Sequence, residues 1–402
     1  MLSYRKLAMR VLGRPLHTGG GISSPRPASQ RAAALVLTAA LLTGAAFPAF
    51  AGTYYIEDGD IVISAGTDTG TNKVAQTGKE TVENDRDTII TNREEGASSH
   101  TVTIEAKDKD DKVEVKLDNV NIDTSKQNKA AVSVTGSGNT TIELDGSNTL
   151  KSGSGHAGLE HNKTDTSGEL TIQDNDKNGS LKAVGGQFGA GIGGAGAAND
   201  AQVKITGGKI TATGGEYGGA GIGGGFKGSG DVTISGGEIH ANGGNYGAGI
   251  GGGEYSSGKV TISGGEINAT GGYLGAGIGG GEKGSGDVTI SGGEITSATG
   301  GKYGAGIGGG KEGRGDVTIE GNTEVNAAGG AGGAGIGGGY VAKNNSNQIT
   351  IAIKSPLRAM RTAVPPSMRS AAVEIKQPNL AALASVLAAI ALQLPILPSR
   401  AK

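Results

Sequence analysis

A regular repeat of glycine and β-branched residues constrains this chain more than any other feature. Between residues 185 and 339 the chain repeats V-T-I-S-G-G-E-I, then a G-G pair near an aromatic residue, then G-A-G-I-G-G-G. The Val203/Ile205 pair and Ile210 recur with the same period as the A-G-I-G core. That core begins at Ala190, Ala220, Ala248, Ala276, Ala305 and Ala334. Several landmarks with one period indicate a repeat architecture, because a flexible linker would not keep Val and Ile in register.

Each period predicts one coil of a parallel β-helix. It contains three short apolar stretches bounded by glycine pairs that signal turns, and none is long enough for a helix. The V-T-I alternation places Val and Ile on one face of a strand and Thr on the other. We therefore predict an all-β fold, a single-stranded parallel β-helix (β-solenoid) of about nine coils of about 28–33 residues each. Disorder of the glycine-rich tract is the main alternative.

The N-terminal segment 1–51 has the composition of a leader. It holds six Lys or Arg residues and no acidic residue, and an apolar run extends from Ala32 to Phe50. The ending Ala49-Phe50-Ala51 fits an A-x-A cleavage site, which predicts a signal peptide and a mature chain that starts at Gly52. We expect the protein to be secreted or on the cell surface. A retained N-terminal membrane anchor is the alternative.

Four further segments follow the leader. Residues 52–100 are polar and acidic and are predicted to be an N-terminal cap or entry segment. Residues 101–184 carry the strand pattern in degenerate form and are predicted to be irregular coils, while residues 185–351 form the regular ones. Residues 352–402 form an atypical tail rich in Ala, Pro and Arg, after one last predicted strand at Ile349 and Ile351. A capping helix over 380–394, a weak membrane anchor and a shifted reading frame are three interpretations of this tail.

Charge and cysteine content exclude several classes of function. Residues 52–351 carry a net charge of −14, while the leader and the tail carry +6 each. An acidic body argues against nucleic acid and anionic lipid as partners. The absence of cysteine excludes disulfides, thiolate chemistry and cysteine metal sites.

Aromatic residues precede the G-A-G motif in most coils. Stacked coils would align them in a ladder, with two possible roles. One is structural, because rings that stack on each other pack the corner of each coil. The other is a flat apolar track that binds sugar rings. The candidate carbohydrate-binding residues are Phe188, Tyr217, Tyr246, Tyr273 and Tyr303.

Two sets of acidic residues also recur along the coils. Like charges one strand apart repel, so these side chains should point to solvent or share a cation. A solvated face is the default interpretation, and calcium binding is the alternative, although the G-G-x-G-x-D repeat of calcium-binding coils is absent. The candidate calcium ligands are Asp231, Asp287, Asp316, Glu238, Glu266 and Glu294. No other cofactor is expected.

No motif in the chain predicts catalysis. His156, Glu160 and His161 resemble zinc hydrolase motifs, but their spacing is wrong and a glycine lies between them. His240 occupies a position held by Thr or Asn in other coils, so we expect a solvent-facing variant. We therefore expect a protein that is not an enzyme. Any catalytic group would have to lie in the irregular coils, because the regular ones are too alike.

The motifs G-D-V-T-I-S-G-G-E-I and G-A-G-I-G-G-G, preceded by N-T-T-I-E-L-D-G-S-N-T-L, resemble the glycine-rich repeats of bacterial surface proteins called carbohydrate-binding domain-containing proteins. The resemblance covers roughly residues 100 to 340. It implies a right-handed parallel β-helix, export, and attachment to plant or host glycans, sometimes with calcium. The chain contains no L-P-x-T-G sorting signal.

The leading hypothesis is an exported, non-catalytic adhesin-like protein that binds polysaccharide through repeated surface ladders, because several weak equivalent sites suit a polymer. A structural stalk or surface-layer protein without a specific ligand is the first alternative. A polysaccharide lyase or hydrolase is the second, and it would need carboxylates from different irregular coils to converge. The sequence does not indicate an oligomeric state.

Overall fold

The computed structural model describes residues 52–197, 200–321, 323–342, 347–353 and 372–375. Contacts within the chain separate a unit at 1–49 from a unit at 50–402, and the description below concerns the second. The predicted signal peptide and the predicted helix at 380–394 lie outside the described residues. Within them, all regular elements are strands except one 3₁₀ turn, η1 (Ile56–Asp58), and none is a helix long and apolar enough to cross a membrane.

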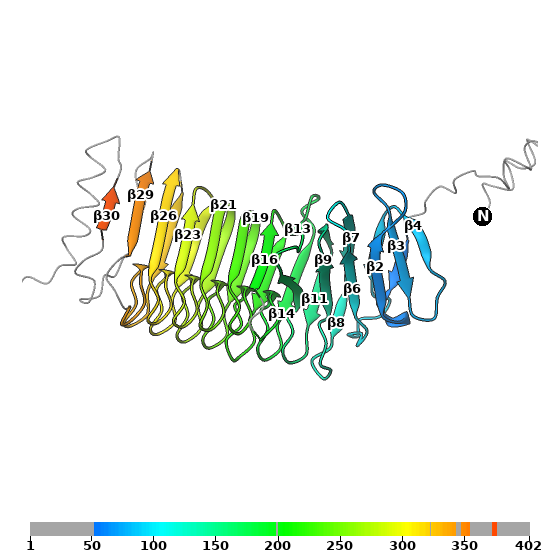
Figure 1. The fold of residues 1–402 in the computed structure, drawn as a ribbon, viewed down its shortest axis with the longest axis horizontal. Coiled ribbons are helices and arrows are strands. Elements are labelled where there is room, and N and C mark those ends of the chain that lie inside the picture. The colour runs from blue at the N-terminus through cyan, green and yellow to red at the C-terminus, as the bar shows by residue number, and fades with distance from the viewer. Residues whose placement is uncertain (1–51, 198–199, 322, 343–346, 354–371, 376–402) are drawn as a thin grey trace, which may run out of the picture. The chain divides into compact units, whose positions relative to one another are not determined.

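The strands stack in three parallel columns, and the chain visits the first, second and third column once per coil (Figure 1). The first column contains β1 (Thr53–Tyr55), β5 (Thr88–Thr91), β7 (Lys112–Asp118), β10 (Asn139–Asp145), β13 (Leu170–Gln173), β16 (Asp200–Ile205), the first halves of β19 (Gly230–Asn242) and β21 (Gly258–Thr270), β23 (Gly286–Ile290), β26 (Gly315–Gly321), β29 (Gln348–Ile353) and β30 (Ala372–Ile375).

The remaining solenoid strands belong to the other two columns. The second contains β8 (Asn121–Asp123), β11 (Ser147–Lys151), β14 (Ser180–Val184), β17 (Lys209–Thr213), the second halves of β19 and β21, β24 (Glu294–Thr299) and β27 (Glu324–Ala328). The third contains β2 (Ile61–Ala65), β6 (Val102–Ala106), β9 (Val132–Gly136), β12 (Leu159–Lys163), β15 (Ile192–Gly193), β18 (Ile222–Gly223), β20 (Ile250–Gly251), β22 (Ile278–Gly279), β25 (Ile307–Gly308) and β28 (Ile336–Gly337). The predicted all-β parallel β-solenoid is confirmed.

The core is a stack of β-branched side chains from all three columns. In β19, Val232 and Ile234 are buried while Thr233 between them is partly exposed, as the V-T-I alternation predicts. Equivalent residues pair from coil to coil, so that Val232 lies beside Val260. The second and third columns add isoleucines such as Ile239 and Ile250, both fully buried. Each regular coil therefore buries its apolar side chains against identical or similar side chains of the neighbouring coils.

The S-G-G segment between the first two columns bends the strand without always ending it. In β19 and β21 the strand runs through this segment, with a shift of register at Ser235. Gly237 has φ of +91°, a conformation that favours glycine. The bend is therefore a bulge in these coils, whereas we expected a turn.

The third column requires glycine because neighbouring backbones approach closely. Gly251 has φ of +127°, and a Cβ there would run into the carbonyl oxygen of Gly279 in the next coil. Gly223, Gly279 and Gly308 repeat this geometry. The G-I-G-G-G motif is thus the sequence that lets two-residue strands stack.

The segment before β6 contains an antiparallel meander. β2 pairs antiparallel with β3 (Asn72–Gln76), and β3 pairs antiparallel with β4 (Val82–Asp85). β2 also pairs parallel with β6 in the third column. The predicted cap segment therefore contributes parallel strands to the first and third columns, through β1, β5 and β2, and only β3 and β4 add antiparallel pairing.

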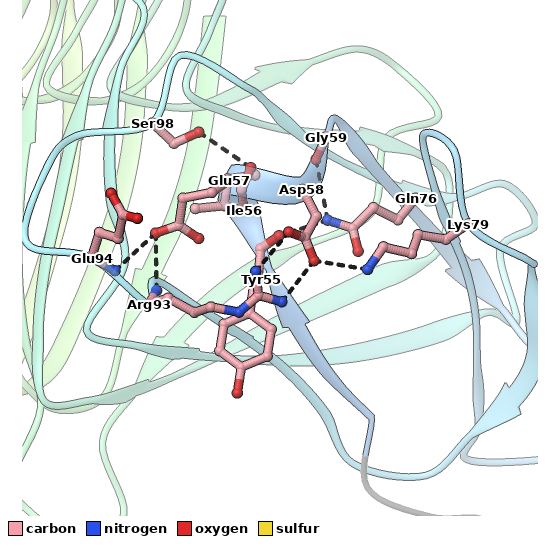
Figure 2. A network of polar contacts seen from close by, with 10 residues as sticks. All are labelled: Tyr55, Ile56, Glu57, Asp58, Gly59, Gln76, Lys79, Arg93, Glu94 and Ser98. Carbon is pink, nitrogen blue, oxygen red and sulfur yellow. Dashed lines mark hydrogen bonds and ion pairs between the residues drawn. The ribbon is translucent and has the colours of Figure 1, made fainter.

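A polar network fastens this meander to η1 and to the loop after β5 (Figure 2). The Arg93 guanidinium donates hydrogen bonds to both carboxylate oxygens of Asp58, at 2.8 and 2.9 Å, and lies 4.0 Å from the centre of the Tyr55 ring. Lys79 also donates to Asp58, at 2.8 Å. These hydrogen bonds, Arg93 first and Lys79 second, lower the pKa of Asp58 to about 2. Bidentate pairing of this kind fixes geometry as well as charge.

The C-terminal strands extend the first column. Ile349 and Ile351 form β29, as expected, and pair with Val317 and Ile319 of β26. β29 is not the last strand, however, because β30 pairs with it in parallel. Part of the atypical tail therefore continues the ladder of the first column.

Candidate binding surface

Two loops flank every short strand of the third column and lie against each other. The entry loop carries an aromatic residue before G-A-G in every such coil except that of β28, and the exit loop follows the strand. The backbone N–H of Glu282 in one exit loop donates to the carbonyl of Tyr246 in the entry loop of the preceding coil, at 2.8 Å. Tyr340 N–H donates in the same way to the Tyr303 carbonyl, also at 2.8 Å. Side chains from both loops therefore share one surface along the stack.

Eight aromatic residues from the two loops lie along this surface, and all of them except Tyr246 belong to one of two ring clusters. We call the eight residues the aromatic band: Phe188, Tyr217, Phe226, Tyr246, Tyr255, Tyr273, Tyr303 and Tyr340. In the first cluster the Phe188 ring lies 5.8 Å from Tyr217 and 5.6 Å from Phe226, and Phe226 lies 6.3 Å from Tyr255. In the second, Tyr303 lies 5.7 Å from Tyr273 and 5.1 Å from Tyr340. These separations are typical of aromatic pairs that attract each other.

The band is an exposed surface as well as a packed corner. Tyr217, Tyr255, Tyr273 and Tyr340 expose 43, 46, 50 and 45% of their surface. Phe188, Tyr246 and Tyr303 are half-buried. Leu274, which takes the aromatic position in the coil of Tyr273, is buried. The structure thus places exposed rings beside half-buried ones, so that the inner rings support the outer ones.

Lysine side chains lie over several of these rings. Lys227 Nζ is 5.1 Å from the centre of the Phe226 ring and Lys283 Nζ is 4.8 Å from that of Tyr255. Lys302 lies 5.6 Å from Tyr273 and 5.2 Å from Tyr303. An exposed cation on a ring face contributes about 0.5–1 kcal/mol. The surface therefore combines ring faces with hydrogen-bond donors.

Two buried carboxylates lie in the exit loops, beside residues of the band. Glu254 and Glu282 are each 7% exposed, and Lys311 Nζ lies 3.2 Å from Glu282 Oε1. Burial raises the pKa of the Glu254 carboxyl, and the nearby charge of Glu282 adds to this, although the Tyr255 hydroxyl opposes it. The hydrogen bond to Glu282 raises the pKa of the Lys311 amine. The ion pair between Glu282 and Lys311 therefore joins the exit loops of two successive coils.

The exit loops hold a column of non-glycine residues in the left-handed conformation. These have φ between 57° and 70°, and they are Ala197, Lys227, Tyr255, Lys283, Glu312 and Val341. The conformation costs roughly 1–2 kcal/mol for each such residue. A ladder of hydrogen bonds maintains it, as in the bond from Tyr255 N–H to the Glu282 carbonyl at 2.8 Å. Strain repeated at one surface is typical of a functional feature.

The predicted acidic ladders lie on the first and second columns, away from the two loops. Asp231 pairs in register with Lys259, which pairs with Asp287, so a lysine interrupts this ladder. Asp231 also lies 3.2 Å from Lys163. Asp287 and Asp316 pair with each other, and Glu238, Glu266 and Glu294 form an unbroken run. Hydrogen bonds from Lys209 first and His240 second lower the pKa of Glu238.

These six carboxylates do not form a metal-binding group in the described part of the chain, where no three of them bring ligand oxygens within 4.8 Å of one another. Calcium binding on the ladders stays a prediction. His240, expected to face solvent, is partly exposed and lies 3.0 Å from Glu238.

A different acidic group, which sequence reasoning missed, lies in the irregular coils. Glu143 of β10 and Asp174 and Asp176 after β13 bring ligand oxygens within 4.8 Å of one another. They adjoin a groove on the first column, lined by Arg86, Asp87, Thr88, Glu114, Lys116, Glu143, Asn175 and Asp176. The signal was present in the sequence as D-N-D-K-N-G at 174–179, the spacing of a calcium loop. Glu143 already accepts two hydrogen bonds from Asn175, each at 2.7 Å.

His156, Glu160 and His161 make hydrogen bonds that serve the packing of the fold. His156 Nδ1 lies 2.8 Å from Glu160 Oε2, and the buried Glu160 also accepts a hydrogen bond from Asn162 at 3.1 Å. The His161 ring is buried between the carbonyls of Val134 and Gly168. Burial lowers the pKa of His161. In the described residues these three side chains do not form a metal-ligand group.

Five segments of the chain match the family described as Beta helix repeat, at residues 203–226, 232–254, 260–282, 288–311 and 317–340. Each matched segment begins at the first-column valine and ends in the exit loop. One matched repeat therefore covers the three strands of one coil and the loops that carry the aromatic band. No curated protein matches the chain. No solved structure matches it either.

Proposed function

We propose that this protein is an exported, non-catalytic surface protein that binds a polysaccharide along the aromatic band. The observation that carries the proposal is the exposure of four tyrosines, Tyr217, Tyr255, Tyr273 and Tyr340, on one surface of the stacked coils. Exposed aromatic faces bind the apolar faces of sugar rings, and tyrosine hydroxyls and lysine amines supply hydrogen bonds to sugar hydroxyls.

The repeat geometry favours a polymer over a small sugar. Each coil offers one or two rings, and the coils succeed each other at about 4.8 Å. Single contacts of this kind are weak, but several engaged at once by one chain add through effective concentration. The two ring clusters would then be two halves of one track. The exported location rests on the predicted leader at residues 1–51.

Retention on insoluble polysaccharides tests the proposal. The chain from residue 52 onward is incubated with cellulose, pectin and mucin, and the bound fraction is compared with that of a Tyr217→Ala, Tyr255→Ala, Tyr273→Ala and Tyr340→Ala variant. We expect at least one polymer to retain the parent, and the variant to lose about tenfold or more in affinity. Circular dichroism checks that the variant keeps its strands.

A matched control separates ring chemistry from general loss of apolar surface. Val62 and Val82 are exposed apolar residues of the N-terminal meander, at 39 and 42%. A Val62→Ala, Val82→Ala variant should bind like the parent. No retention of the parent on any polymer would favour a structural stalk, in which the rings only pack each other.

A polysaccharide lyase or hydrolase is the second candidate, and one observation favours it. Carboxylates from two irregular coils, Glu143 and the pair Asp174 and Asp176, converge beside Lys116 at a groove. Carboxylates and a base at one place are what acid–base cleavage of a sugar chain needs. New reducing ends or unsaturated products from a soluble polyuronate, lost in a Glu143→Gln, Asp176→Asn variant, would support this candidate over the first.

A further inference from the structure

Asp85, at the end of β4, is a buried carboxylate without a cation. Its exposed fraction is 1%. Thr88 Oγ1 donates a hydrogen bond to Asp85 Oδ2 at 2.9 Å, and Asn72 Nδ2 donates to Thr88 Oγ1 at 2.9 Å. No ion pair among the described residues involves Asp85. A buried charge with only neutral partners is strongly unfavourable, so the site calls for a positive group.

The other carboxylate oxygen of Asp85 faces the backbone nitrogen of Gly52. Gly52 N donates to Asp85 Oδ1 at 2.9 Å, and Asp87 N–H makes a longer contact with the same oxygen at 3.5 Å. The Gly52 carbonyl accepts a hydrogen bond from Ile89 N–H at 2.9 Å. Gly52 is therefore fixed on both sides, at the residue where the sequence predicts the mature chain to begin.

The backbone of Gly52 lies against two polar side chains. A Cβ there would come within 2.5 Å of Asp85 Oδ2 and of the Tyr54 hydroxyl, so both side chains would have to shift. The Tyr54 hydroxyl is itself buried and makes no hydrogen bond of good geometry. Burial first, and the charge of Asp85 second, raise the pKa of this hydroxyl. One charged oxygen and one poorly partnered oxygen thus lie next to Gly52.

We propose that Asp85 is the binding site for the α-ammonium group of a chain that begins at Gly52. A signal-peptide-cleaving protease hydrolyses the Ala51–Gly52 peptide bond with one water molecule. The carboxylate remains on Ala51 of the released leader, and the new amine of Gly52 takes up a proton. The amide N–H that donates to Asp85 in the precursor then becomes a cation with three N–H groups, beside a buried carboxylate.

Cleavage would in this way complete the N-terminal end of the solenoid. Gly52 precedes β1, which pairs with β5 at the start of the first column, and Asp85 and Asn72 belong to the meander. The ion pair joins these elements only in the processed chain. This inference rests on the exported part of the proposed function and is independent of glycan binding.

Four proteins test the ion pair between Asp85 and the α-ammonium group of Gly52. One chain begins at Gly52 and another at Ala51, which moves the ammonium group by one residue, and each is made with Asp85 and with the Asp85→Asn substitution. We expect the Gly52 chain to melt on the order of 5 °C above the Ala51 chain when Asp85 is present, and the two chains that carry Asp85→Asn to melt alike. Equal Tm values with Asp85 present, or a difference that persists in Asp85→Asn, would overturn the proposal. The exposed neighbour Asp87→Asn is the matched control and should preserve the difference.

A second measurement does not depend on the variant folding. In the Gly52 chain, the α-amino group is titrated by NMR. An ion pair raises its pKa above the ordinary value of about 8, so the stabilisation is present below that pH and is lost as the pH rises through the raised pKa. An amine that titrates at its ordinary value contradicts the proposal, as does a secreted protein whose first residue, by mass spectrometry, is not Gly52. Neither result depends on any polysaccharide, so failure here is separate from failure of the proposed function.

Discussion

The part of the chain before residue 185, which holds the entry segment and the irregular coils, and the regular coils after it reach the same architecture by different chemistry. All but four of the buried polar side chains of the described residues lie between Thr71 and His161, and the four exceptions are Glu254, Ser256, Glu282 and Asn347. In the regular coils, backbone ladders between glycine-rich loops take the place of side-chain bonds.

One column of the core shows the difference directly. Asn148 in β11 pairs with Leu181 of β14, which pairs with Ile210 of β17, so an asparagine occupies an interior position that is aliphatic in later coils. Its side chain accepts from Val120 N–H at 2.9 Å and donates to the carbonyls of Asp145 and Ser180. In the irregular coils, side chains therefore form hydrogen bonds to backbone N–H and C=O groups. In the regular coils, the backbones of neighbouring coils supply such hydrogen bonds to each other.

The largest expected effect comes from breaking the regular ladder at a glycine. Gly251→Ala places a Cβ against the carbonyl of Gly279 in a backbone with positive φ. We expect a loss of about 3 kcal/mol in the free energy of unfolding, measured with urea. Gly96, where a Cβ meets nothing within 4 Å, is the control, and Gly96→Ala should be nearly neutral. Equal effects at both sites would mean that close backbone approach does not set the stability of the coils.

The next largest loss of stability is expected when a polar residue of an irregular coil is replaced by the aliphatic residue of the regular pattern. Asn148→Leu supplies the aliphatic residue of the later coils but removes the acceptor of Val120 N–H and one hydrogen-bond donor from each of the Asp145 and Ser180 carbonyls. A loss of about 2 kcal/mol is expected in the same urea experiment. A more stable variant would show that the polar column is dispensable.

Acid should weaken the meander before the regular coils. The pKa of Asp58 is about 2 in the folded protein, below its ordinary 3.8, so its pairing stabilises the fold above about pH 4 and is lost as the pH falls toward 2. The hydrogen-exchange protection factors of the η1 and β3 amides, taken relative to the intrinsic rate at each pH, should fall over this range, and Asp58→Asn should remove this pH dependence. Glu83, in the exposed pair with Lys73, is the control residue, since Glu83→Gln should change little.

The smallest expected effect concerns the aromatic band. Lys302 lies over the rings of Tyr273 and Tyr303 and is exposed. Lys302→Ala should cost about 0.5 kcal/mol of stability by thermal unfolding. A loss above about 2 kcal/mol would indicate that the band is mainly a structural corner.

The sequence predicted the coils well because Val232, Ile234 and their equivalents repeat with a period that only stacked strands satisfy. It predicted the exit loops and the meander poorly. Phe226, Tyr255 and Tyr340 of the exit loops were not among the predicted binding residues. The aromatic residue of this variable loop occupies either of two adjacent positions, so it does not follow the repeat period. The contact of Gly52 with Asp85 spans 33 residues and follows no periodicity. Exposure of a ring depends on how two loops lie against each other, which a repeat pattern does not specify.

The affinity for sugar chains of increasing length tests the central claim most directly. Oligosaccharides prepared from whichever polymer retains the protein are titrated calorimetrically against the chain from residue 52 onward. If the aromatic band is a track, Kd should fall steeply with each added sugar until the chain spans a ring cluster, and this gain should vanish in the four-tyrosine variant. A Kd that does not depend on length, or that is unchanged in that variant, would contradict the account.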